Sequence, residues 1–350
     1  MLTARFKKHT LIFKRASSTS RGVLHAKDSW YIFISNSESP DYYGTGECSL
    51  IPGLSPDNPE QFEIELKTLC KRINDYPLWV ESRGHLFPAI RFGLETALFD
   101  LVEGGKCFFG ETAFTRGIAG IPTNGLVWMG EAAFMKKQIK QKLDAGFNCL
   151  KMKVGAIDFN DELAILYAVR KEFSPNHLEI RLDANGAFRN NQALEKIKRL
   201  SELGIHSIEQ PIKPNQACVL ALICKESPIP VALDEELINV PDEKQALLLK
   251  QIKPAYIILK PSLLGGINVS KKWIGYAEAA NIGWWITSAL ESNIGLNVIA
   301  QWTFKTGNKM TQGLGTGQLF TNNIESPLEM RGGKLFYNPA ISWKKQLLKP

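Results

Sequence analysis

Polar and hydrophobic positions alternate along the first part of the chain, as they do in strands, and then recur at helical spacing. The strand-like segments, separated by turn-forming Ser, Gly and Asp residues, are 2–14, 21–35 and 42–49. Residues 59–73 and 88–102 then carry apolar side chains every three or four positions, and Pro88 suits the first turn of the second helix. Strands followed by helices, without alternation, predict an α+β unit over residues 1–120.

From residue 121 onwards, short apolar runs alternate with amphipathic stretches. The apolar runs are 126–129, 149–154, 178–182, 206–209, 230–233, 255–259 and 283–288. The stretches with helical spacing between them are 131–145, 158–173, 190–203, 241–250 and 266–281. This alternation predicts βαβ units and a parallel sheet over residues 121–317; the number of units favours a closed barrel, although the period alone also fits an open doubly wound sheet. The alternation is lost over 318–350, which we expect to return to the first unit.

The composition is that of a folded globular protein. The 350 residues are 44% hydrophobic and 22% charged, which excludes a disordered or collagen-like chain. No run reaches the ~18 uncharged apolar residues of a membrane span, and the basic segment 1–13 lacks the apolar stretch of a secretory signal. The six cysteines include no C-x-x-C pair, and a chain of this length needs no disulfides. We therefore expect a cytoplasmic protein without a membrane partner, and the sequence leaves its oligomeric state open, a homo-oligomer included.

The chain is basic, with a formal net charge of +7 and a pI near 9.0. Its positive residues are spread out, and the densest groups are only pairs such as Lys7-Lys8 and Lys136-Lys137. We therefore expect a solvated surface that binds nucleic acid only weakly and non-specifically. A mild positive field also suits the capture of a small polyanionic substrate.

Ionisable residues stand at the carboxyl ends of five successive predicted barrel strands. They are Lys153, Asp183, Glu209, Asp234 and Lys260. Lys151 points to the same face as Lys153, because side chains alternate along a strand. A single carboxylate at a strand end is more often a helix N-cap, and a single strand lysine usually extends to solvent. Five such groups in order instead favour a shared site, because parallel barrels place their active sites at this end.

The residue types at these positions indicate a particular chemistry. Three converging carboxylates repel one another strongly unless a cation lies among them. Oxygen ligands without His or Cys select Mg²⁺, or Mn²⁺, over zinc. Partial burial beside a cation lowers the pKa of a flanking lysine toward neutrality, so that it can act as a general base. Three acids between two lysines therefore predict abstraction of a proton α to the carboxylate of a small substrate, with the cation stabilising the enediolate.

Sequence motifs spread over nearly the whole chain point to one family. The central motif is the Lys-x-Lys strand at 151–153, followed by the three acids and the second lysine. Further motifs are RFGLE at 91–95, LDANG at 182–186, SALESNIG at 288–295 and GLGTGQLF at 313–320. These motifs resemble the enolase superfamily, in particular its muconate-lactonising subgroup and the o-succinylbenzoate synthase family within it.

The resemblance implies an N-terminal α+β capping domain, a TIM-like (β/α)7β barrel, and Mg²⁺ or Mn²⁺ bound by Asp183, Glu209 and Asp234. It implies that Lys153 removes the α-proton and then protonates the departing hydroxide. Lys260 would stabilise the enediolate as a cation, partly through cation–π contact. The implied reaction is the syn dehydration of a cyclohexadiene carboxylate that bears a succinyl group, in menaquinone biosynthesis. The residues expected to contact this substrate are Lys151, Arg181, Ser288, Gly315 and Thr316.

The same machinery also suits a different reaction. Two opposed lysines can racemise a substrate, because one removes a proton and the other returns it, so an N-acylamino acid racemase or a dipeptide epimerase is the alternative. A dipeptide epimerase would be expected to carry an Asp-x-Asp motif on the eighth strand, and segment 313–317 has no carboxylate. A non-catalytic protein would be expected to have lost one of the five groups, and all five are present.

Overall fold

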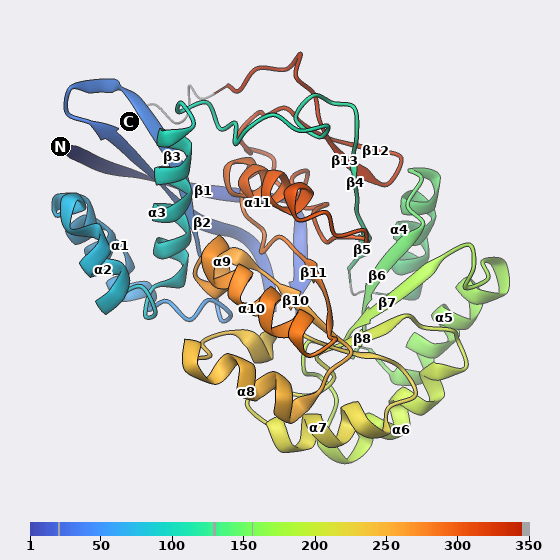
Figure 1. The fold of residues 1–350 in the computed structure, drawn as a ribbon. Helices are drawn as coiled ribbons and strands as arrows, with labels where there is room; N and C mark the ends of the chain where they lie inside the picture. Colours follow the sequence, from blue (N-terminus) through green and yellow to red (C-terminus); the bar gives the residue numbers. More distant parts are fainter. Residues whose placement is uncertain (20–21, 129–130, 156, 345–350) are drawn as a thin grey trace.

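Two units make up the molecule: a small sheet with helices at the amino-terminal end, and a barrel of alternating strands and helices (Figure 1). The computed structural model describes residues 1–19, 22–128, 131–155 and 157–344. Met129, in the first predicted barrel strand, and residues 345–350 of the predicted C-terminal segment lie outside the described residues.

The N-terminal unit is a three-stranded antiparallel sheet packed against helices. Its strands, in spatial order, are β1 (Leu2–Thr19), β2 (Gly22–Asn36) and β3 (Ser39–Ser49). Its helices are α1 (Pro59–Lys71), α2 (Tyr76–Ser82) and α3 (Pro88–Val102), with a 3-10 turn at Ile73–Asp75. Sheet and helices share one buried core, to which Trp30, Ile32, Phe62 and Leu94 belong. The predicted order of strands and then helices is confirmed, whereas α2 was not predicted.

Seven parallel strands form the second unit, each beside the strand that precedes it in the chain. The strands are β5 (Gly125–Val127), β6 (Cys149–Lys153), β7 (Glu179–Asp183), β8 (Ser207–Glu209), β9 (Val231–Leu233), β10 (Tyr256–Leu259) and β11 (Gly283–Ile286). The connecting helices are α4 (Ala132–Asp144), α5 (Phe159–Glu172), α6 (Asn190–Ser201), α7 (Ala217–Glu226), α8 (Asp242–Ile252), α9 (Pro261–Leu264), α10 (Ile267–Ala279) and α11 (Asn293–Thr306). The strands are almost entirely buried, as expected for a parallel sheet covered by helices. In the described part of the chain, no helix combines the length and apolar character needed to cross a membrane.

A very short eighth strand position closes this sheet. Gln312 pairs in parallel with Thr123, just before β5, and Gly313 pairs in parallel with Thr287, just after β11. The amide of Gly313 donates to the carbonyl of Ile286 at 2.8 Å. Residues 312–313 therefore join the two outer strands, and the predicted (β/α)7β barrel is confirmed over the open doubly wound sheet.

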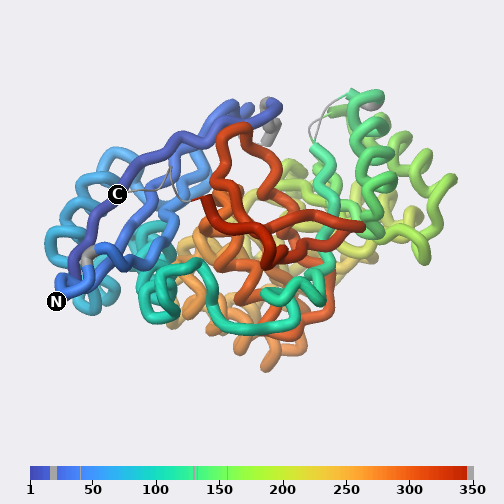
Figure 2. The backbone as a smooth tube through the Cα atoms, turned by 90° about the horizontal axis from the view of Figure 1, so that it is seen from above, coloured from blue at the N-terminus to red at the C-terminus, as the bar shows by residue number. Residues whose placement is uncertain are grey.

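The C-terminal segment returns to both units. Its two strands, β12 (Leu328–Arg331) and β13 (Lys334–Tyr337), form a small antiparallel sheet with β4 (Ile121–Pro122). Before them, Phe320 bridges Phe13 of β1. Figure 2 shows this part of the chain, in red, beside the first strand, in blue. The predicted boundaries after residues 120 and 317 stay predictions.

Helix α3 lies unusually close to β3, because glycines face it. A Cβ atom at Gly46 would collide with the backbone carbonyl oxygen of Gly93 in α3, and one at Gly44 would collide with the backbone of Ala97. Backbone atoms cannot yield as the end of a long side chain can. The closeness of helix and sheet therefore depends on these glycines, and it fixes the end of β3 beside the barrel.

The stability of Gly46→Ala, compared with that of an alanine variant at a glycine without close neighbours, should test this packing. We expect Gly46→Ala to lower the free energy of unfolding by about 3 kcal/mol, because overpacking forces backbone shifts. A Cβ atom added at Gly275 in α10 would meet no other atom within 4 Å, so Gly275→Ala should raise the free energy of unfolding by up to about 1 kcal/mol through helix propensity. Urea denaturation of both variants measures the two values; equal effects would contradict the close packing of α3.

Candidate active site

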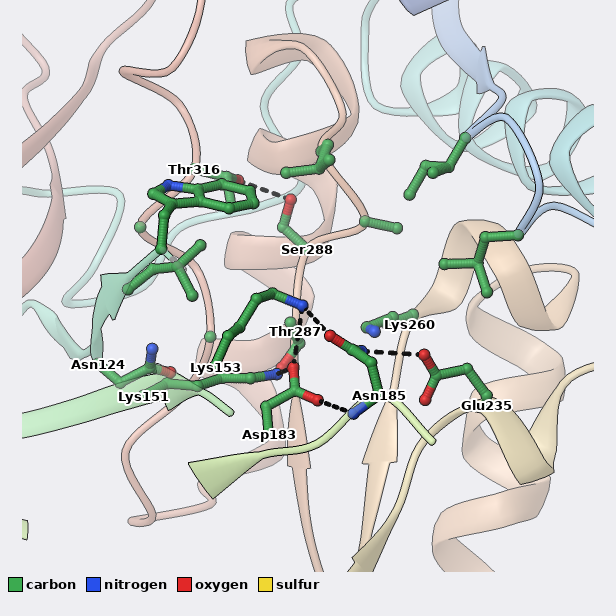
Figure 3. Close-up of a pocket in the computed structure, with 18 of the residues that line it drawn as sticks. Asn124, Lys151, Lys153, Asp183, Asn185, Glu235, Lys260, Thr287, Ser288 and Thr316 are labelled. Atoms are coloured by element: carbon green, nitrogen blue, oxygen red, sulfur yellow. Dashed lines mark hydrogen bonds and ion pairs between the residues drawn. The ribbon is translucent and has the colours of Figure 1, made fainter. Parts of the chain in front are cut away.

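A pocket opens at the carboxyl ends of the barrel strands (Figure 3). Its polar lining consists of Asn124, Lys151, Lys153, Asp183, Asn185, Glu235, Lys260, Thr287, Ser288 and Thr316. Leu126 and Trp128 of the barrel line it with apolar side chains, and Ile51 and Leu54 do so from the N-terminal unit. The pocket therefore combines several charged groups with apolar walls, which suits a substrate that has both a hydrocarbon ring and carboxylates.

Strand register brings the predicted acids and lysines to one end of the barrel. Lys153 of β6 aligns with Asp183 of β7, which in turn aligns with Glu209 of β8. Asp234 directly follows β9, and Lys260 directly follows β10. No side chain of these five is more than 12% exposed, so their charges interact through a medium of low polarity.

Ammonium groups lie among the three acids. Lys151 Nζ is 3.0 Å from Asp183 Oδ2 and 2.6 Å from Glu209 Oε2. Lys260 Nζ forms an ion pair with Asp234 Oδ2. Each acid therefore contacts a lysine. Lys151, predicted to contact the substrate, lines the pocket but directs its ammonium group at two of the acids.

A chain of polar contacts holds Lys153 at the pocket. Its Nζ lies 3.3 Å from Asp183 Oδ2 and donates to Asn185 Oδ1. The amide group of Asn185 donates in turn to Glu235 Oε1 at 3.0 Å (Figure 3). Asn185 and Glu235 were not predicted. The available signal was position, since Asn185 follows Asp183 by two residues and Glu235 follows directly on Asp234.

Negative charge is concentrated around Glu209. Burial alone would raise the pKa of Asp183, but the ammonium groups of Lys151 and Lys153 outweigh it and hold that pKa well below its usual range. Burial and the neighbouring Asp183 carboxylate raise the pKa of Glu209 well above its usual range, although Lys151 donates to it. A divalent cation would neutralise such an excess of negative charge.

The prediction that a neighbouring cation lowers the pKa of the flanking lysines stays a prediction. Burial favours a lower pKa for Lys151, but the carboxylates of Asp183 and Glu209 outweigh it and raise the pKa. Asp234 has the same effect on the pKa of Lys260. In the arrangement described here, the charged groups in contact with Lys151 and Lys260 are carboxylates.

The oxygen ligands offered by the three acids fit a hard divalent cation, although their side chains are not arranged around a single point. Asp183, Glu209 and Asp234 are each at most 3% exposed and offer the oxygen ligands that Mg²⁺ prefers. Within the described ranges, no three His, Cys, Asp or Glu side chains are placed to hold a metal ion as they stand. In this arrangement, the ammonium groups of Lys151 and Lys260 contact the three acids.

Arg181 lies outside the pocket, so its predicted contact with the substrate is not supported. It precedes Asp183 by two residues on β7, which places it about 7 Å nearer the amino end of the strand. Its guanidinium group donates to the carbonyl of Thr311 at 2.8 Å and to Glu179 at 2.6 Å, and lies 4.3 Å from the ring centre of Trp285. Strand alternation identified the correct face of the sheet but not the depth in the barrel.

Ser288, Gly315 and Thr316 line the pocket, as predicted for substrate contacts. Thr316 Oγ1 donates to Ser288 Oγ at 2.7 Å, and Ser288 Oγ donates to Glu291 Oε2 at 2.6 Å. Both hydroxyl protons are therefore engaged within the protein. The contact of these residues with a substrate stays a prediction.

The loop that carries Ile51 and Leu54 to the pocket is tied to α3 through Asp57. Asp57 Oδ1 accepts a hydrogen bond from the amide of Ala89 at 3.1 Å. Its Oδ2 has no hydrogen-bond partner among the described residues, and the residue is 2% exposed. Burial raises the pKa of this carboxyl to about 7.

Asp57 should therefore make stability depend on pH. Its pKa in the unfolded chain is about 3.9, so the folded state binds more protons between about pH 4 and pH 7. The stabilisation from this group is complete below that window and is lost as the pH rises through it. We expect Asp57→Asn to lose less stability than the wild type between pH 4.5 and pH 7.5 in urea denaturation; an identical change in both proteins would contradict the raised pKa.

Comparison with known proteins places the chain in a family. Residues 134–339 match a family model described as enolase C-terminal domain-like. The chain is 48% identical to an o-succinylbenzoate synthase of Desulfotalea psychrophila, over 94% of this chain and 97% of that protein. The crystal structure of MenC from Desulfotalea psychrophila LSv54 has a TM-score of 0.87 at 45% identity and covers 96% of this chain and 99% of that one.

A more distant structure shares the fold. It is a dipeptide epimerase from Enterococcus faecalis V583 complexed with Mg and the dipeptide L-Leu-L-Tyr, with a TM-score of 0.80 at 19% identity over 96% of each chain. At this identity the likeness concerns the fold alone. The family model covers more than half of the chain, and the Desulfotalea relative covers nearly all of it. The chain therefore belongs to the enolase superfamily.

Proposed function

We propose that the chain catalyses the reaction of an o-succinylbenzoate synthase. This reaction is the syn dehydration of 2-succinyl-6-hydroxy-2,4-cyclohexadiene-1-carboxylate to o-succinylbenzoate in menaquinone biosynthesis, and the enzyme is a carbon–oxygen lyase. Identity of 48% along nearly the whole length of a relative with this name supports the proposal. A pocket with apolar walls and several lysines also suits a ring that carries two carboxylates.

Lys153 is the group that moves the proton. In its neutral form, the amine takes the α-proton of the substrate. The ammonium group so formed gives a proton to the departing hydroxide, which leaves as water. One lysine that acts twice from the same side of the ring accounts for syn elimination. Asp183 and Asn185 hold this amine at the pocket wall.

Lys260 stabilises negative charge from another wall of the pocket. Three strands separate β10 from β6 in the sheet, so Lys260 and Lys153 approach a bound substrate from different sides. The ammonium group of Lys260 stabilises the charge that spreads over the ring and its carboxylate, both directly and through cation–π contact. This pair of lysines in one pocket supports the proton-transfer chemistry, whereas the 48% identity to an o-succinylbenzoate synthase is the observation that carries the choice of reaction.

Asp183, Glu209 and Asp234 are the residues that would hold Mg²⁺, or Mn²⁺. When bound there, the ion supplies positive charge to the substrate carboxylate as negative charge develops on it. The three acids, each at most 3% exposed, would fix the position of the ion. A cytoplasmic location and a homo-oligomeric state stay predictions.

Incubation with the cyclohexadiene precursor and Mg²⁺ tests the proposal. Ultraviolet absorbance should report the formation of the aromatic product, and EDTA should abolish it. A flat trace together with racemisation of N-acyl amino acids would instead favour the alternative. The residues lining the pocket at Gly313, Gly315 and Thr316 offer no carboxylate for an α-ammonium group, which disfavours a dipeptide epimerase.

A further inference from the structure

Three buried charged residues lie where the N-terminal sheet meets the barrel. They are Lys27 of β2, Glu47 of β3 and Glu291, which lies between β11 and α11, and none is more than 3% exposed. They do not belong to the lining of the pocket. Buried charges need close partners, and each of these three has at least one hydrogen-bond partner in segment 287–292.

Glu47 holds the start of α11 from the N-terminal sheet. Its Oε1 accepts a hydrogen bond from the Ser292 amide at 2.8 Å, and its Oε2 accepts from the Ser292 hydroxyl at 2.6 Å and the Gly295 amide at 2.9 Å. Amides at the start of a helix have no partner within the helix, and the helix dipole favours a carboxylate there. Glu47 therefore holds Ser292, two residues beyond the pocket-lining residues 287–290.

Lys27 contacts the same segment at Leu290, a residue that lines the pocket. Its Nζ donates to the carbonyl of Leu290 at 2.9 Å, and to the hydroxyls of Ser29 and Ser49. Leu290 lines the pocket and has a φ of 61°, a left-handed conformation that leucine adopts only where its surroundings impose it. The hydrogen bond from Lys27 is a contact that imposes it from the N-terminal sheet.

Glu291 extends these contacts to the pocket wall. Its Oε2 accepts hydrogen bonds from the Ser288 hydroxyl at 2.6 Å and from the Ala289 amide at 2.8 Å. Its Oε1 accepts from the hydroxyl of Ser262, two residues after Lys260. Ser288 and Ala289 both line the pocket. Segment 287–292 is therefore held by the N-terminal sheet on one side and by α9 on the other.

We propose that Lys27 and Glu47 are positioning residues, through which the N-terminal sheet sets the conformation of the pocket-lining residues 287–290 without touching the substrate. The kinetic part of this inference rests on the proposed function. If either contact is lost, segment 287–292 samples other conformations, and the pocket binds its substrate less well. None of these contacts reaches Lys153, so the proton transfer itself continues once the substrate is bound.

Glu95 provides a matched control for the test. This residue of α3 also crosses to the barrel, where it accepts hydrogen bonds from the amides of Ile267 and Asn268 at 2.6 and 3.0 Å, at the start of α10. It lies outside the pocket lining. We expect Lys27→Met and Glu47→Gln to raise KM about tenfold or more, with kcat within about threefold of the wild type. Glu95→Gln should leave both constants unchanged.

Amide hydrogen exchange tests the same contacts without a substrate. Peptides that cover 287–296 should exchange faster in Lys27→Met and Glu47→Gln than in the wild type, whereas Glu95→Gln should speed exchange only near the start of α10. A wild type that does not dehydrate the precursor would overturn the proposed function, and exchange would still decide the inference. Glu47→Gln keeps an acceptor oxygen and therefore serves as the test if Lys27→Met does not fold. Unchanged exchange over 287–296 in Glu47→Gln would overturn the inference. Values of KM and kcat equal to those of Glu95→Gln would also overturn it.

Discussion

Replacement of Lys153 by alanine is expected to lower kcat by about 10²–10⁴-fold, the range for loss of a general acid–base group. The lysine lines the pocket, and in the proposed mechanism it takes the α-proton and returns a proton to the leaving hydroxide. Lys153→Arg should be nearly as inactive, because a guanidinium group keeps the positive charge but does not release its proton. Product absorbance under saturating substrate measures kcat for both variants.

Lys140 supplies the control for this experiment. It is an exposed lysine on α4, with an ion pair to Asp144 at 3.2 Å. Lys140→Ala should therefore keep the activity of the wild type. Turnover by Lys153→Arg at a rate near that of Lys140→Ala would show that Lys153 contributes only charge, and would remove it from the role of base.

Replacement of Asp183 by asparagine is expected to impair both activity and stability. Asp183 is 1% exposed and contacts the ammonium groups of Lys151 and Lys153. Removal of one partner from a buried ion pair costs about 3–5 kcal/mol. Loss of one of the three proposed metal-binding carboxylates should also raise the activation free energy by several kcal/mol, which lowers kcat/KM on the order of 10³-fold. Urea denaturation measures the loss of stability and kcat/KM the loss of activity, and titration calorimetry measures the affinity for Mg²⁺, which should also fall.

The matched control is Asp144→Asn, which removes an exposed acid of the same type. Its ion pair with Lys140 is worth less than about 1 kcal/mol, so stability, Mg²⁺ affinity and activity should all stay near those of the wild type. Wild-type affinity for Mg²⁺ in Asp183→Asn would contradict the assignment of Asp183 as a ligand.

The barrel could be predicted from the sequence because its strands are short, continuous and apolar. Runs such as 255–259 contrast clearly with the amphipathic helices around them, and β10 (Tyr256–Leu259) lies where that pattern placed it. Three barrel helices, α7, α9 and α11, lie outside the predicted stretches, and α9 is a single turn. Helix α11 is buried along most of its length between the two units, and α7 is short and largely apolar, so neither shows a strong polar face. The eighth strand position shows no apolar run, because only residues 312–313 pair there, so it was placed at 313–317 through the family resemblance alone.

The site was predictable in its residue types and less so in its geometry. Position at the strand ends placed Lys153 and Asp183 at one level, and the register confirms this alignment. Strand alternation could not separate Arg181 from the pocket, since it gives the face of the sheet and not the depth along the barrel. The contacts of Asn185 with Glu235 arise between loops that are 50 residues apart, so no local pattern reports them.

The central claim is that Asp183, Glu209 and Asp234 hold a divalent cation between two lysines. Anomalous scattering from crystals grown with saturating Mn²⁺ tests it most directly. We expect a single anomalous peak at the carboxyl ends of β7, β8 and β9, in contact with all three acids, and the Lys151 ammonium group displaced from the position it has here. Absence of a peak, or a peak that one of the three acids does not contact, would contradict the account.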